Sequence, residues 1–257
     1  MGLMKLSLRL RAHDWTAVLI ELLIVIVGIL IALQVSNWNQ GRLDRARGDS
    51  YYLRLQAELE ADQRAMDQAR KFWAQVAGFG RAAIAYSETG QRIDGSNWKT
   101  VLAYYHGSQI MPLELEDTTF SEMRDGGDLV LIANEDLRKQ LADYYRLTGT
   151  GMRANILRHD PAYRIQVRGL TPTAVQEYIW KSCFRQLEGT NQELIDCPSP
   201  IAEDEADDIL TTYRSSASLL ESLRYWNSTL AVSSIVIGGA HKQATSLAAD
   251  VEKARAR

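Results

Sequence analysis

Residues 15–35 read WTAVLIELLIVIVGILIALQV, and this stretch decides how the rest of the chain is interpreted. Its only charged side chain is Glu21. At about 1.5 Å of rise per residue, a helix of this length is about 31 Å long, which matches the hydrocarbon core of a bilayer. Trp15 and Trp38 flank the run, where indole rings favour the membrane interface. The sequence therefore predicts a transmembrane helix over residues 15–38.

A cleaved signal peptide is the alternative to an anchor, because three basic residues precede the apolar run. Lys5, Arg9 and Arg11 form the positively charged start that signal peptides share. The apolar run is long, however, and Gln34 and Asn37 interrupt any small-x-small cleavage site at its end. We therefore expect an uncleaved anchor.

The charges on the two sides of the run leave its orientation nearly balanced under the positive-inside rule. Basic residues are equally frequent on both sides, but acidic residues are more frequent on the second. This slight difference favours residues 1–14 in the cytoplasm and residues 39–257 outside it. The flanking charges are Lys5, Arg9, Arg11 and Asp14 before the run, and Arg42, Asp44, Arg45, Arg47 and Asp49 after it.

One face of the membrane segment carries a pattern typical of helix packing. Glu21, Gly28 and Ala32 share that face, and Gly28, Ala32 and Ser36 form a small-xxx-small ladder. Small residues let two membrane helices approach closely, so we expect contact with another copy or with a different membrane protein. Glu21 is also close enough to the start of the segment for its side chain to reach the headgroups, which is the alternative to a partner within the membrane.

Two blocks of the sequence resemble an uncharacterised bacterial family of single-pass inner-membrane proteins. The first is ELLIVIVGILIALQVSNWN, residues 21–39, in which Ser36 replaces the usual first Asn of an N-N-W-N motif. The second is TTFSEMRDGGDLVLIANEDLRKQLADYY, residues 118–145. The resemblance implies an inner-membrane anchor with a periplasmic helical domain and no known activity.

After the membrane segment, the chain reads as a long amphipathic helix in an all-α domain. Its apolar residues recur at heptad spacing, and Asp62 interrupts them once. Such a face needs a partner, which is either another copy or the final helix of the same domain, from Ile209 through Leu223. The apolar positions are Tyr52, Leu55, Leu59, Met66, Ala69, Trp73 and Val76.

Several short motifs indicate where further helices begin. Ser96 or Asn97 can cap a helix through residue 106, residues 119–122 fit a capping box, and Asn134 can cap the next helix. Gly126 and Gly127 can close the helix that the capping box begins. Thr171-Pro172 predicts the start of a helix that includes Phe184, and Ser199-Pro200 predicts the start of a long final helix.

The predicted final helix has two unusual stretches. Acidic residues at 203–208 suit the positive end of a helix dipole, which we prefer to a cation site. Residues 226–240 read WNSTLAVSSIVIGGA and are too short and polar for a second span. We expect a buried helix that ends at Gly238 and Gly239, with lipid contact as the alternative, and one more short helix after it.

Cys183 and Cys197 are the only cysteines and lie 14 residues apart. In an oxidising compartment, a disulfide between them would stabilise the domain by about 3 kcal/mol, because it restricts the unfolded chain. Two independent buried thiols are the alternative. A zinc site is not expected, because no Cys-x-x-Cys motif or nearby histidine pair completes four ligands.

The sequence gives no sign of catalysis or of nucleic-acid binding. The four histidines are scattered, no hydrolase, metalloprotease or phosphate-loop motif occurs, and the net charge is −3 without a basic stripe. We therefore expect no enzyme, cofactor or metal, but a non-catalytic scaffold or accessory subunit of an inner-membrane complex. The alternative is an extracytoplasmic sensor or ligand-binding module with a pocket lined by Trp98, Tyr104, Tyr105, Tyr144 and Tyr145.

Overall fold

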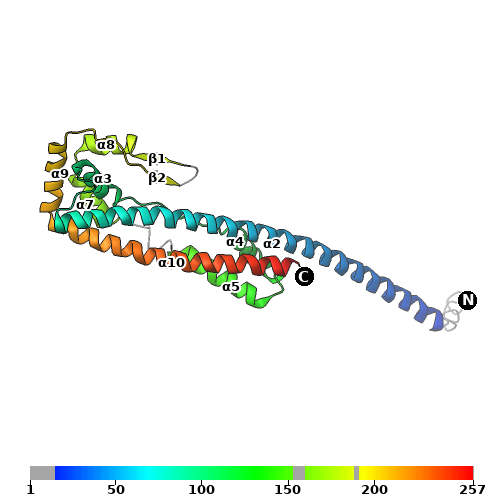
Figure 1. Cartoon of the computed structure of the whole chain (residues 1–257). Helices are drawn as coiled ribbons and strands as arrows, with labels where there is room; N and C mark the ends of the chain where they lie inside the picture. The colour runs from blue at the N-terminus through cyan, green and yellow to red at the C-terminus, as the bar shows by residue number, and fades with distance from the viewer. Residues whose placement is uncertain (1–14, 153–159, 188–190, 257) are drawn as a thin grey trace, which may run out of the picture. The chain divides into compact units, whose positions relative to one another are not determined.

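The computed structural model describes residues 15–152, 160–187 and 191–256, which are predominantly helical and include one two-stranded hairpin (Figure 1). The predicted all-α class is confirmed. The chain divides into two compact units, residues 1–51 and 52–257, and the division falls inside helix α2 (Trp15–Thr89).

The first unit contains the apolar part of α2, the one helix of the described chain that is long and apolar enough to cross a membrane. From Val18 to Val35 the side chains are exposed, including those of leucine, isoleucine and valine. A helix with such a surface is stable in lipid rather than in water. The structure thus agrees with a membrane anchor near the N-terminus.

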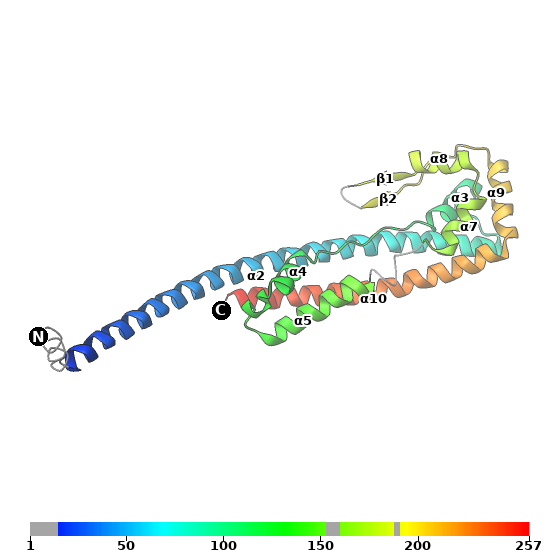
Figure 2. The ribbon, with the colours of Figure 1, turned by 180° about the vertical axis from the view of Figure 1, so that it is seen from behind.

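The second unit is built around an antiparallel pair, the part of α2 from Tyr52 onward and helix α10 (Ala217–Arg255), which run side by side in Figures 1 and 2. Buried positions recur along both helices with steps of three and four residues, as in a coiled coil. In α2 they are Tyr52, Leu55, Leu59, Asp62, Met66, Ala69, Trp73, Val76, Gly80 and Ala83. In α10 they are Leu219, Leu223, Trp226, Leu230, Ser233, Ile237, Ala240, Ala244, Leu247 and Val251. We call these two rows the seam.

The seam decides between the two partners that the sequence left open for α2, because a helix of the same domain covers it. Most of that helix lies beyond the expected residues 209–223. The predicted end of a helix at Gly238 and Gly239 is wrong, since α10 continues through both to Arg255. A break occurs instead at Ser216, whose side chain accepts a hydrogen bond from Leu219 N and separates α9 (Glu203–Ser215) from α10.

Four helices gather at the end of the α2–α10 pair where α2 finishes and α10 begins (Figure 1). They are α3 (Asn97–His106), α7 (Ala162–Leu170), α8 (Thr173–Ser182) and α9. Ser96 caps α3, as expected. The backbone N–H of Asn97 also donates a hydrogen bond of 2.7 Å to the Glu203 carboxylate. The acidic start of α9 is therefore joined to α3, rather than only exposed to solvent.

Two expected helix starts and one expected helix end differ from the structure in this part of the domain. Helix α8 begins after Pro172, and the hydroxyl of Thr171 donates to Val167 O instead of capping it. Phe184 lies outside α8 and begins β1 (Phe184–Gln186), which pairs with β2 (Gln192–Leu194). The hydroxyl of Ser199 donates to Ile201 O in a turn, and α9 begins later, at Glu203.

The remaining helices lie along the other half of α10. They are α4 (Thr118–Gly126), the short helix η1 (Asp128–Leu131), α5 (Glu135–Arg146) and η2 (Leu147–Met152). Gly127 ends α4 with a φ of 76°, and Asn134 caps α5, both as expected. The expected capping box is not formed: the Glu58 carboxylate of α2 accepts from the Thr119 N–H at 3.0 Å and from its hydroxyl at 2.6 Å.

Candidate functional site

The predicted membrane-packing face is exposed along its length. Glu21, Gly28, Ala32 and Ser36 are all exposed on α2, and a Cβ added at Gly28 would have no neighbouring atom within 4 Å. The face is thus available for a partner helix, and its use for packing stays a prediction.

The aromatic residues that could line a ligand pocket are core residues in the described structure. Their exposed fractions are 5% or less. They also lie in separate clusters: Tyr104 contacts Tyr213, with ring centroids 4.8 Å apart, whereas Tyr145 stacks on Phe120 at 4.6 Å. Trp98 contacts Tyr178 at the disulfide end of α8. In the described residues, Trp98, Tyr104, Tyr105, Tyr144 and Tyr145 therefore pack in the core at different places rather than in one cluster.

The predicted disulfide between Cys183 and Cys197 is present, with the two Cα atoms 5.2 Å apart. It joins the end of α8 to the segment before α9, across the hairpin of β1 and β2. The indole of Trp98 donates a hydrogen bond of 2.9 Å to Cys197 O. This hydrogen bond holds the segment against α3.

A buried acid lies inside the seam. Asp62 accepts one hydrogen bond from the Tyr144 hydroxyl at 2.6 Å and another from the Glu116 N–H at 2.8 Å. Burial raises the pKa of Asp62 to about 6. Sequence reasoning identified Asp62 only as a gap in the apolar pattern, because its partners are 54 and 82 residues away. Its role in this structure is to hold α5 and the segment before α4 against α2.

Two arginines of α7 form a second polar cluster that sequence motifs do not reveal. The Arg168 guanidinium lies 5.1 Å from the Tyr105 ring and 5.0 Å from the Trp180 ring. Arg164 and Arg168 both donate to Gln109 Oε1, and Arg164 also pairs with Asp160 at 3.1 Å. Burial lowers the pKa of Arg168 to about 10. These contacts join α7 to α3, to Gln109 in the segment after α3, and to Trp180 of α8.

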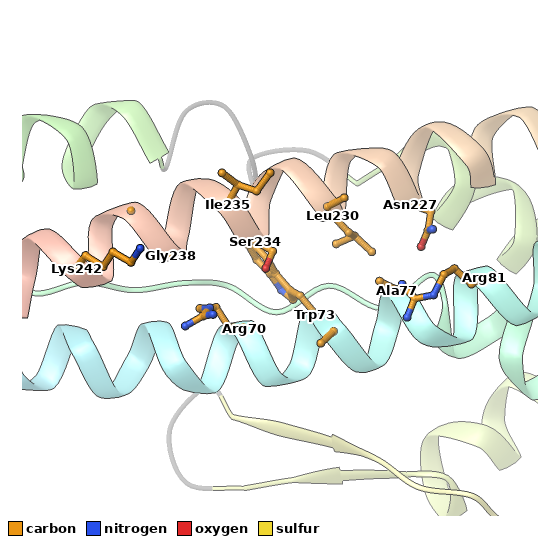
Figure 3. Close-up of a pocket in the computed structure, with 13 residues that line it drawn as sticks. Arg70, Trp73, Ala77, Arg81, Asn227, Leu230, Ser234, Ile235, Gly238 and Lys242 are labelled. Carbon is orange, nitrogen blue, oxygen red and sulfur yellow. The ribbon is translucent and has the colours of Figure 1, made fainter.

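A groove of about 760 Å³ runs along one side of the α2–α10 pair, and we call it the α2–α10 groove (Figure 3). Its lining residues mostly come one position after seam residues: Ala74 follows Trp73, and Ala231 follows Leu230. In an antiparallel pair, these positions of both helices fall on the same side. The small lining residues are Ala74, Ala77, Ala231, Ser234, Gly238 and Gly239.

Polar bridges between the two helices bound the groove at both ends. Toward the α2 C-terminus, Arg224 pairs with Glu88 at 2.6 Å. Toward the other end, His241 lies 3.4 Å from Asp67, and the Thr245 hydroxyl donates to Gln63 at 3.1 Å. The short side chains between these bridges leave the side of the pair open.

Three cations lie along the groove, and none of the described residues that line it is acidic. They are Arg70 and Arg81 on α2 and Lys242 on α10 (Figure 3). Arg70 forms an ion pair of 3.6 Å with Asp67, three residues before it on α2. For Arg81 and Lys242, no carboxylate oxygen of the described residues lies within 4.0 Å. The groove therefore combines a small-residue floor with a positive rim.

The opposite side of the α2–α10 pair is covered by other helices. There α5 and α7 pack on α10, and the Ser222 hydroxyl donates to Gln166 of α7 at 2.9 Å. Ile235 of α10, which is 75% exposed, lines the groove. The groove side is thus a face of the pair that neither α5 nor α7 covers.

Comparison of the chain with protein-family models, with curated proteins and with solved structures finds no match in any of the three.

Proposed function

We propose that this protein is a non-catalytic, membrane-anchored helical protein that serves as a scaffold or accessory subunit of a complex in a bacterial inner membrane. The observation that carries the proposal is the row of exposed apolar side chains from Val18 to Val35. An unburied apolar helix of this length needs lipid, and it joins directly to a domain with a large helical core. Such a protein holds a folded domain at the membrane.

The main domain lies in the periplasm in this proposal, with residues 1–14 in the cytoplasm. The disulfide between Cys183 and Cys197 supports this orientation, because structural disulfides persist in oxidising compartments. The small charge difference across residues 15–38 favours the same orientation.

The scaffold is favoured over a ligand-binding sensor by the use of the aromatic residues. The side chains that a ligand pocket would need are engaged with each other in the core. In contrast, the α2–α10 groove is an elongated face between two helices, which suits a protein partner.

Two measurements on the full chain test the proposal. Alkaline phosphatase fused after Arg257 should be active, whereas a reporter that works only in the cytoplasm should be inactive at the same site. After gentle solubilisation, the protein should copurify with a membrane-protein partner in fixed stoichiometry. Recovery in the soluble fraction, the opposite reporter result, or purification with a retained small molecule and no protein partner would each contradict it.

A further inference from the structure

We propose that the α2–α10 groove is the docking site for an acidic helix of a partner protein, which completes a three-helix bundle. The inference rests on the proposed function as a scaffold and names the surface and the chemistry of its partner. It starts from the arrangement of side chains in Figure 3, where small residues of both helices face the groove and long basic side chains edge it.

The length of the groove matches a short helix. Arg70 and Arg81 are 11 residues apart on α2, so the floor between them extends for about 17 Å, or three helical turns. Helices approach to 8–10 Å depending on the side chains at the contact, and residues such as Ala77 and Ala231 permit the closest approach. A third helix of about three turns therefore fits between the polar bridges that bound the groove.

The basic side chains along the groove favour a partner helix with acidic residues. Arg81 and Lys242 lie at opposite ends of the floor and on different helices, and neither has a carboxylate neighbour among the residues that the structure describes. A helix with Asp or Glu on both of its edges would pair with both cations and with Arg70. Complementary potentials of this kind steer association and fix register.

A second copy of this chain does not suit the groove as a symmetric partner. In a two-fold dimer each surface meets itself, so the three cations of one copy would face the same three cations of the other. Like charges at an interface cost association free energy. Ile235, which is 75% exposed, gives the groove an apolar edge. A helix from another protein can bury this side chain without the repulsion between like charges.

The test is site-specific photo-crosslinking of the full-length protein in its native membranes. A benzophenone amino acid replaces Ile235, at the edge of the groove, and in a matched control it replaces Tyr225, which is exposed on the same helix away from the groove. We expect position 235 to yield one product whose crosslinked peptide lies in an Asp- and Glu-rich helical segment of another protein. Position 225 should not yield it.

Charge reversal then tests the role of the cations. Arg81→Glu with Lys242→Glu should lower the yield of this product at least about tenfold, because two attractive contacts become repulsive. Lys139→Glu with Lys181→Glu makes the same change in net charge at exposed sites away from the groove, and should leave the yield unchanged. Equal melting temperatures of the two double variants would show that both remain folded.

Four outcomes would overturn the inference: crosslinking to a second copy, crosslinking to lipid, no product specific to position 235, or a product whose yield does not change on charge reversal. These outcomes are separable from failure of the proposed function. If the protein is anchored and copurifies with a fixed partner but shows one of them, the scaffold stands and its docking surface lies elsewhere.

Discussion

The hydroxyl of Tyr144 donates a hydrogen bond of 2.6 Å to the carboxylate of Asp62, in a row of the α2 seam where the adjacent residues, Leu59 and Met66, are apolar. An ionised acid that is buried at such a position destabilises the folded state, unless its hydrogen bonds compensate for the lost hydration. The hydrogen bonds of Asp62 compensate for only part of the lost hydration, because burial is the largest influence and raises the pKa of Asp62 from 3.8 to about 6.

The first prediction is that Asp62→Asn stabilises the protein at pH 8. Since the folded pKa of Asp62 exceeds the unfolded value, its contribution to the free energy of unfolding is fully present below pH 3.8 and is lost as the pH rises through 6. Asparagine cannot ionise, so the free energy of unfolding of the variant at pH 8 should exceed that of the wild type by about 1–3 kcal/mol. Urea unfolding of the detergent-solubilised full chain measures it.

The pH dependence of that difference is the critical observation. It should be small at pH 4 and grow until about pH 7. Burial lowers the pKa of His106 to about 4, but His106 titrates in both proteins and cancels in the difference. Asp136→Asn, at an exposed site of α5, should show no such growth. A difference that stays constant from pH 4 to 8 would refute this account of Asp62.

The seam shows what the sequence could predict and what it could not. Apolar residues at heptad spacing identify the buried face of α2, because the same periodicity governs burial in the folded helix. The partner face on α10 is harder to recognise, since Ser233, Ala240 and Ala244 are too small or polar to stand out. Gly238 and Gly239 predict a helix end, yet packing along α10 outweighs a helix cost of about 1 kcal/mol for each glycine.

Long-range contacts account for the other differences. The N-terminus of α4 is capped by Glu58, 61 residues before Thr119, and no local motif reveals such a contact. The α2–α10 groove depends on the register between two helices that are distant in the sequence: Arg224 and Glu88, which pair between them, are 136 residues apart. The disulfide could be predicted because only one pairing of two cysteines exists.

The second prediction concerns the close approach of two backbones at Gly80 and Gly107. A Cβ at Gly107 would lie 3.0 Å from Ala103 O and 3.1 Å from Gly80 N, and neither is the end of a flexible side chain. Gly107→Ala should therefore lower the free energy of unfolding by about 1–3 kcal/mol. Gly78→Ala is the matched control: its nearest neighbour, Arg81 Nη2, is 3.8 Å away, so alanine should stabilise the helix by about 0.5–1 kcal/mol. Thermal unfolding that shows equal effects would exclude the proposed backbone contact.

The third prediction concerns the disulfide. Cys183→Ala with Cys197→Ala should lower the free energy of unfolding by about 3 kcal/mol, because the unfolded chain regains the freedom of a loop closed over 14 residues. Reductant should destabilise the wild type by a similar amount and leave the double variant unaffected. Thiol labelling of the denatured, unreduced wild type should detect no free cysteine. Two reactive thiols in protein taken directly from cells would contradict both the bond and the proposed compartment.

The last prediction concerns association within the membrane, where Gly28 has nothing within 4 Å of its added Cβ and lies on one face with Glu21, Ala32 and Ser36. Lipid tails are as apolar as leucine, so membrane helices associate through close packing, which a bulky residue at the contact prevents. Gly28→Ile should therefore reduce crosslinked oligomers or heteromers in native membranes without reducing insertion, and Ala32→Ile should act in the same way. Ile26→Leu, on the opposite face, should have no effect. If all three variants give the crosslinked species of the wild type, then Gly28 faces lipid, and association must depend on the domain outside the membrane.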